Sequence, residues 1–191
     1  MSDEKSNDQN NEIQSRAEIE ELLRQKNIPG ADLSGQDLSG MKLAGMNMEG
    51  ANFSGADLTK AILAAGNMAG INLANAQLGE ARIAAANMAE ADLSGAQMAA
   101  STVQAANLEN ANLTGADLTG SKWMAVNVSG ADFTDAQMSG ARSSAVAWSS
   151  AKVPPAETPE SMGPPPWLPA LFAGIAILIA IVIISKKRNR E

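Results

Sequence analysis

The chain has 191 residues with 21 acidic and 14 basic side chains, a formal net charge of −7, no histidine, no cysteine and 3% aromatic residues. The acidic balance argues against a protein that grips nucleic acid. The missing residue types exclude disulfides, zinc sites built on His or Cys, and catalysis by a His or Cys base or nucleophile. With so few aromatic side chains, a thick globular core is not expected.

The N-terminal part of the chain is polar and then becomes amphipathic. Residues 1–14 are polar and acidic and are expected to be disordered. Ser15-Arg16-Ala17-Glu18 has the pattern of a capping box, followed by a short apolar stripe of Ile19, Leu22 and Leu23. We therefore predict a helix at 17–25, inside a segment at 15–30 that covers the first edge of the structure that follows.

Residues 31–150 repeat with a period of five. They divide into 24 consecutive pentapeptides without an insertion. The third position is Leu in eleven units and Met in five, and the first position is Ala in fifteen. Neither the period of a helix nor that of a flat strand fits this pattern. The chain must therefore turn a corner every five residues.

These units resemble the A(D/N)LXX pattern of the pentapeptide-repeat family, as in Ala91-Asp92-Leu93-Ser94-Gly95 and Ala116-Asp117-Leu118-Thr119-Gly120. The resemblance implies an all-β fold, a right-handed quadrilateral β-helix with four pentapeptides in each coil and about six coils. The large central residue and the small first residue would both point inward. Coils about 4.8 Å apart would give a rod about 29 Å long. We place this solenoid at 31–152, with Trp148 as a plug for its last coil.

Units four apart in sequence share one face of such a rod. The first, second, third and fourth faces begin at residues 31, 36, 41 and 46, respectively. The third face carries no acidic residue and presents a basic stripe, which we define as Lys42, Ile62, Arg82, Thr102, Lys122, Met124 and Arg142. All eleven Asp and Glu residues of the repeats lie on the other faces.

Two interpretations of the basic stripe remain open. Its composition can reflect drift, because solvated charges of this kind interact only weakly. Alternatively, it is a docking surface for an acidic protein partner or for anionic lipid headgroups. A ladder on the fourth face is interpreted as structural, because stacked amides can bond to one another; it comprises Asn47, Asn67, Asn87, Asn107 and Asn127.

The C-terminal part of the sequence predicts a linker and a membrane anchor. Residues 153–166 are rich in proline and predict a semi-rigid spacer. Residues 167–184 contain no charge, and a helix at 167–185 would span a bilayer at about 1.5 Å per residue. A basic tail follows at 186–191. The expected anchor residues are Trp167, Phe172, Ile175, Ile179, Val182, Lys186, Lys187 and Arg188.

Two signals disagree about orientation in the membrane. The positive-inside rule places the basic tail in the cytoplasm and the solenoid outside. The first 16 residues, however, contain no apolar segment that would serve as a secretory signal peptide. A sortase-like signal also needs export, and its cleavage motif is not recognisable here. We favour a single-pass tail anchor with the solenoid in the cytoplasm.

These features predict a non-enzymatic scaffold or spacer that holds a protein-binding solenoid near a membrane. We expect an unidentified protein partner and no cofactor, metal, nucleic acid or small-molecule substrate. Scattered Asp and Ser residues on a convex rod form no evident catalytic cleft. The resemblance raises one alternative, a mimic of DNA that protects an enzyme such as gyrase. The acidic faces fit that alternative. The family members that mimic DNA, however, are associated with a C-terminal dimerisation helix, and here the linker and the expected anchor take that position.

Overall fold

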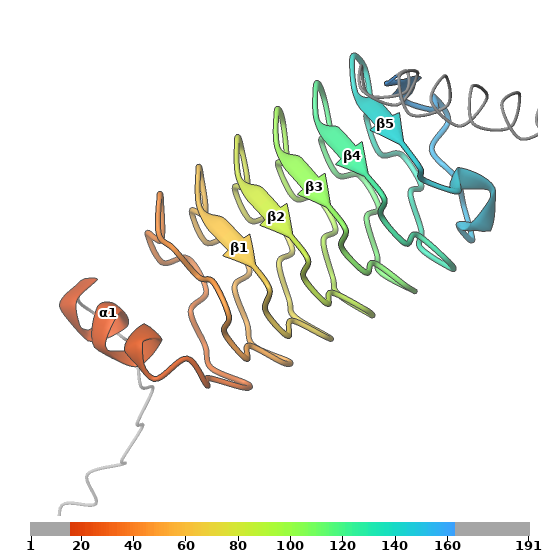
Figure 1. Cartoon of the computed structure of the whole chain (residues 1–191). Coiled ribbons are helices and arrows are strands. Elements are labelled where there is room, and N and C mark those ends of the chain that lie inside the picture. Colours follow the sequence, from red (N-terminus) through yellow and green to blue (C-terminus); the bar gives the residue numbers. More distant parts are fainter. Residues whose placement is uncertain (1–15, 163–191) are drawn as a thin grey trace, which may run out of the picture. The chain divides into compact units, whose positions relative to one another are not determined.

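A computed structural model describes residues 16–162 (Figure 1). An N-terminal helix, α1 (Arg16–Arg24), is followed by coils that repeat every 20 residues, as in the parallel bridges that join Asn27 to Asn47 and Lys42 to Ile62. Five such steps lead from Lys42 to Arg142, so the rod is a parallel β-solenoid of about five turns. These five steps join six stacked positions, one in each of the six coils expected from the 24 units.

The third face forms the extended sheet of the rod. Its strands are three residues long and pair in parallel, with each residue opposite the one 20 places later. A two-residue strand at the C-terminal end joins the same sheet beside β5. The strands are β1 (Ile62–Ala64), β2 (Arg82–Ala84), β3 (Thr102–Gln104), β4 (Lys122–Met124), β5 (Arg142–Ser144) and β6 (Glu160–Ser161).

The corner after the third face differs from the other three corners. At those corners, an N–H three residues on from a central residue bonds to its carbonyl, as Ala96 does to Leu93 at 3.0 Å. Among the described residues, no such bond closes the corner after a third-face unit. As at the other corners, the fifth residue there has a positive φ angle, and in five units it is an exposed alanine at 50–54°: Ala65, Ala85, Ala105, Ala125 and Ala145. This conformation costs a residue with a Cβ about 1–2 kcal/mol, and the ladders on both sides hold it in place.

Central and first-position side chains form the core, as the repeat pattern predicts. Leu73 and Leu93 are fully buried, and so are the first-position residues Ala76 and Ala96. The single polar central residue, Ser143, lies opposite Trp123 of the preceding coil. Because the large indole fills the space there, a small side chain fits above it.

Each end of the rod is covered. Helix α1 begins and ends one residue before the predicted positions, and it buries Ile19 against the first coil. At the other end, Trp148 lies in a 3-10 turn, η1 (Trp148–Ser150), with its ring 5.6 Å from Trp123 and 5.5 Å from Phe133. The aromatic plug predicted for the last coil is therefore present. The predicted capping residue Ser15 and the polar residues 1–14 lie outside the described part.

The boundary predicted between solenoid and linker differs from the structure. The chain continues around the rod after residue 152, because Phe133 donates its N–H to the Val153 carbonyl at 2.9 Å and Glu160 donates to Ala141 at 3.0 Å. Pro155 and Pro159 are buried in this closing segment. Proline has no N–H to leave unpaired, so it suits the last layer of a ladder.

The predicted membrane helix at 167–185 and the basic tail at 186–191 lie outside the described residues. Within 16–162, no helix has the length and apolar character needed to cross a bilayer.

Candidate docking face

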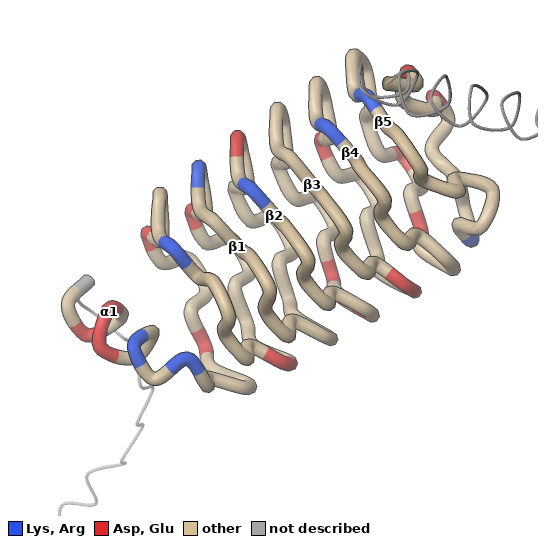
Figure 2. Tube along the Cα trace, in the orientation of Figure 1, with Lys and Arg blue, Asp and Glu red and all other residues tan. Residues whose placement is uncertain are grey.

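The structure brings the residues of the basic stripe together in single file. Parallel pairing places Lys42 opposite Ile62, and then in turn Arg82, Thr102, Lys122 and Arg142, each beside the next. The four basic side chains are exposed, whereas Ile62, Thr102 and Met124 are half-buried. Figure 2 shows the basic positions along the sheet at the starts of β2, β4 and β5.

The cations of the stripe have no acidic partner within the described part of the chain. Elsewhere on the rod, Lys60 pairs with Glu80 at 3.8 Å, and Lys152 pairs with Asp132 at 3.4 Å. Lys122 and Arg142 are direct neighbours in the ladder, where like charges repel each other. Apart from Glu160 at its C-terminal end, described next, the stripe is a positive surface, which an anionic surface would stabilise.

One residue of this file was missed by sequence reasoning. Glu160 donates its N–H to the Ala141 carbonyl, just as Arg142 donates to Ser121 and Lys122 donates to Ser101. It therefore takes the next position after Arg142 and ends the stripe with a negative charge. No repeat signal marks this position, because Glu160 follows a proline-rich stretch that breaks the five-residue pattern.

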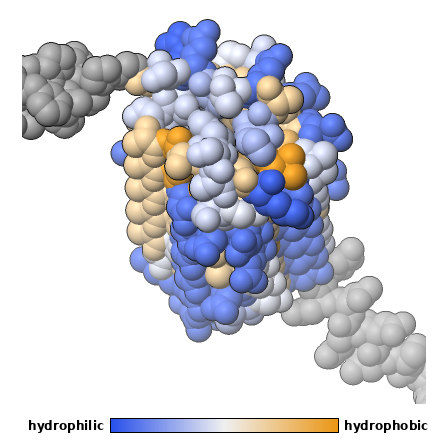
Figure 3. Space-filling model, turned by 90° about the vertical axis from the view of Figure 1, so that its right-hand side faces the viewer, coloured by the Kyte–Doolittle hydropathy of each residue, from blue (hydrophilic) through white to orange (hydrophobic). Residues whose placement is uncertain are grey.

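The surface beside the stripe is flat. Fourth and fifth positions of the third face are mostly alanine, and the exposed column from Ala65 to Ala145 follows the edge of the sheet. Figure 3, which shows the C-terminal end, has a straight edge of small, mildly hydrophobic residues running along the rod. Such a face can meet another flat surface closely over its whole length.

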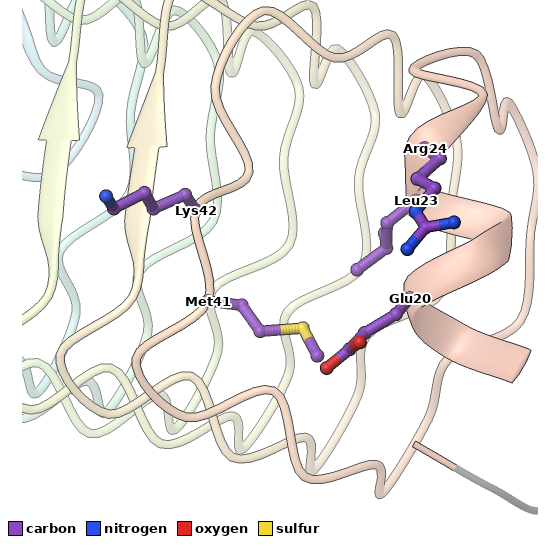
Figure 4. Close-up of a pocket in the computed structure, with 5 residues that line it drawn as sticks. All are labelled: Glu20, Leu23, Arg24, Met41 and Lys42. Carbon is purple, nitrogen blue, oxygen red and sulfur yellow. The ribbon is translucent and has the colours of Figure 1, made fainter. Parts of the chain in front are cut away.

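A shallow pocket lies where α1 meets the first unit of the third face. It has a volume of about 340 Å³ and is lined by Glu20, Leu23, Arg24, Met41 and Lys42. Leu23 and Met41 point toward each other across it, and Lys42 points away from the helix along the rod (Figure 4). The pocket places the Glu20 carboxylate near the side chains of Arg24 and Lys42.

The Asn ladder on the fourth face is structural, as predicted. Each amide donates from Nδ2 to the Oδ1 of the Asn one coil earlier, over distances of 2.8–3.2 Å from Asn27 to Asn127. The Oδ1 atoms of Asn107 and Asn127 also accept a backbone N–H two residues on. These side chains are occupied by bonds within the rod.

Aspartates on the first and second faces also accept hydrogen bonds from the backbone. Asp92 accepts the N–H of Ser94 at 3.0 Å and an amide hydrogen of Asn112 at 3.1 Å. The Thr134 hydroxyl donates to Asp132 at 2.6 Å, and this bond, helped by the Thr134 N–H, lowers the pKa of Asp132. Asn112 makes the same turn bond as Asp92, to Thr114, so the fold accepts either residue type and does not require the charge.

Within residues 16–162, no three His, Cys, Asp or Glu side chains cluster in a way that would hold a metal ion. The second pocket in this part, lined mainly by second-face residues such as Gln137 and Met138, is also open and small. The extended surface of the third face is therefore the candidate site.

Sequence comparison matches the pentapeptide repeats family at residues 30–63, 67–102 and 106–142, in eight copies. The chain belongs to the pentapeptide-repeat family. The matched segments lie inside the solenoid and together cover more than half of the chain. No curated protein sequence matches significantly.

Comparison with solved structures finds members of this family. A trypsin-treated variant of QnrB1, a plasmid-mediated fluoroquinolone resistance protein, is 21% identical over 66% of this chain and 76% of its own, with a TM-score of 0.53. HetL, involved in heterocyst differentiation regulation in the cyanobacterium Nostoc sp. strain PCC 7120, is 26% identical over 60% of this chain, with a TM-score of 0.41. The chain spans only 56% of HetL. A pentapeptide repeat protein of the Arabidopsis thaliana thylakoid lumen is 31% identical over 57% of this chain and 66% of its own, with a TM-score of 0.28.

Proposed function

We propose that this pentapeptide-repeat protein is a membrane-tethered, non-enzymatic scaffold that docks an anionic surface on its third face. A right-handed, four-sided rod would leave its other faces free for a protein partner. The observation that carries the proposal is the separation of charge between faces. Folding does not require it, because Asn and Asp fill the same ladder positions at Asn112 and Asp92.

A scaffold suits a rod without a cleft. Its surface is convex, the two pockets described above are open, and the family is generally non-enzymatic. Flat ladders of this kind present side chains at fixed spacing, which favours recognition of extended surfaces. The expected anchor at 167–185 would keep the rod beside a bilayer.

The test compares two variants that change the net charge equally. The first replaces Lys42, Arg82, Lys122 and Arg142 with Gln, and the second adds four Glu residues on other faces through Ser54→Glu, Ser94→Glu, Ser129→Glu and Ser139→Glu. Both change the charge by −4 at solvent-facing positions, where substitutions cost little stability. We expect both to fold, as circular dichroism would show.

The readout is recovery of membrane fragments by chains that end at Gly163, because the expected anchor would hold lipid in every variant of the full-length chain. The third-face variant should lose it and the control should keep it, and wild-type recovery should fall as salt rises. Equal recovery by both variants would show that the stripe is compositional drift.

The acidic faces support a second candidate, mimicry of DNA. Duplex DNA is a rod with one negative charge per about 1.7 Å of its length. The repeat region is also a rod with negative charge along it, because eleven acidic residues lie on three of its faces. Inhibition of gyrase supercoiling by the purified rod would favour mimicry. The expected tether and the cations of the third face argue for the scaffold.

A further inference from the structure

We propose that the anionic surface docked by the third face is the headgroup layer of the bilayer that tethers the chain, so that the rod lies flat on its basic stripe. This inference rests on the proposed function, which supplies the tether. It names the partner as anionic phospholipid.

The path of the chain supports this choice. After circling the last layer, the chain returns to the third face, where the Glu160 N–H bonds to Ala141 at 3.0 Å. Five residues lie between Ser161 and Trp167, where the expected anchor begins, so six Cα–Cα steps join the two positions. A segment of that length reaches at most about 20 Å. The tether therefore starts on the face that carries the basic stripe, and it limits how far that face can move from the bilayer.

The charges favour the same orientation. Lys42 and Arg142 are five coils apart, which is about 24 Å at the ordinary strand spacing. All four cations can therefore contact one headgroup layer together. Each basic residue near an anionic leaflet strengthens association about fivefold. Glu160 offsets one of them, which leaves a gain on the order of a hundredfold.

The acidic residues of the first face do not prevent this contact, and Glu80, which lies two residues before Arg82 on the adjoining second face, is paired with Lys60 at 3.8 Å. The first face lies on the opposite side of the coil, about 10 Å or more away, because each face is about three extended residues wide. Screening at physiological salt acts over about 8 Å. The carboxylates of Asp32, Asp92 and Asp132 would therefore face solvent and interact only weakly with the leaflet.

The flatness of the third face favours lipid over an acidic protein as the docking partner. Protein interfaces depend on large buried anchors, most often Trp, Tyr or Arg seated in pockets. The third face has no exposed Trp or Tyr, its large apolar side chains Ile62 and Met124 are half-buried between small alanines, and neither pocket described above lies along β1–β5. A layer of mobile headgroups needs only exposed cations and a flat approach.

The experiment reads which face is covered in the full-length chain. The chain has no cysteine, so a single thiol can be placed by Ala44→Cys on the third face or by Ser34→Cys on the first. Both residues are exposed fourth positions of the first coil, far from the tether. Each variant is reconstituted into vesicles of phosphatidylcholine, with or without phosphatidylglycerol, and treated with a membrane-impermeant maleimide. The rate at which each thiol reacts in detergent measures its intrinsic reactivity, and the rate in vesicles is divided by it.

With phosphatidylglycerol present, the Ala44→Cys thiol should react at least about tenfold more slowly than the Ser34→Cys thiol, given the attraction of three net charges. The two rates should become equal in pure phosphatidylcholine and at about 0.5 M salt. A second pair tests the role of Glu160. Adding Glu160→Gln should slow the Ala44→Cys reaction about a further fivefold, whereas Glu157→Gln, beside the second-face residues, should not.

The outcomes separate the two proposals. Failure of the chain to float with any vesicle would refute the tether and therefore the proposed function. Flotation with equal reactivity of both thiols in anionic vesicles would leave the tether intact and overturn lipid docking. Protection of the Ala44→Cys thiol in native membranes, but not in pure anionic lipid, would also overturn it and would identify an acidic protein as the partner.

Discussion

Removing one amide from the Asn ladder tests whether this file of side chains stabilises the rod. In Asn87→Ala, the bond from Asn87 to Asn67 at 3.1 Å and the bond from Asn107 to Asn87 at 3.2 Å are both lost. A third contact, from the Ala89 N–H at 3.5 Å, is long and adds little. The substitution therefore removes two good hydrogen bonds and leaves the core unchanged.

The expected cost follows from the exposure of these groups. Asn87 is exposed and its neighbours are half-buried, so water can replace each lost bond in part. At about 0.5–1 kcal/mol for each bond, Asn87→Ala should lower the free energy of unfolding by about 1–2 kcal/mol. Asn87→Asp keeps the acceptor for Asn107 and loses only the donor to Asn67, so it should cost about half as much.

Urea unfolding of residues 1–162, followed by circular dichroism, measures the effect. All the inter-coil bonds of the described rod lie within this segment. A urea midpoint lower by about 0.5–1 M is expected for Asn87→Ala. Gln77→Ala is the control, since Gln77 occupies the same position of a second-face unit. An Asn87→Ala midpoint equal to that of Gln77→Ala would refute a stabilising ladder.

Three further predictions concern the core, the anchor and acid stability. Leu93→Asp places a charge in the core and should cost several kcal/mol, whereas Ser94→Asp should stay within about 0.5 kcal/mol; equal thermal melts would contradict the inward assignment. A chain ending at Gly163 should leave carbonate-washed membranes and keep its folded spectrum, and its retention there would reveal another membrane contact. Because the pKa of Asp132 is lowered below 3.8, its stabilising bonds are complete above about pH 4 and are lost as the pH falls through the lowered value. Thr134→Val should raise that pKa toward 3.8, as a carboxyl NMR titration would show.

The repeat made most of the rod predictable from the sequence. A period of five fixes which side chains face inward and which residues stack, so the order of the basic stripe and of the Asn ladder followed from counting. The cap helix was predictable because its apolar spacing and polar start are local signals. Its boundaries differ from the structure by only one residue.

The last layer was not predictable from the repeat. The proline-rich composition after Val153 favours an extended linker when local preference alone is considered. In the structure, the open edge of the last coil offers unpaired backbone groups, and the chain pairs with them at Val153 and Glu160. This tertiary interaction decided the conformation of a segment whose local pattern predicted a spacer. It also brought Glu160 into the stripe.

Because stacked positions are 20 residues apart, the length of the chain between two coils decides which residues lie on the same face. Inserting a single pentapeptide after Glu90 would preserve every unit and its inward residues, yet it would turn all later units by one face. Thr102 would then lie on Asn87, and Gln97 on Arg82, so both the amide ladder and the file of cations would be interrupted. Inserting four pentapeptides would restore both. Changes in length that keep this surface must therefore come in whole coils, even though the fold itself accepts single units.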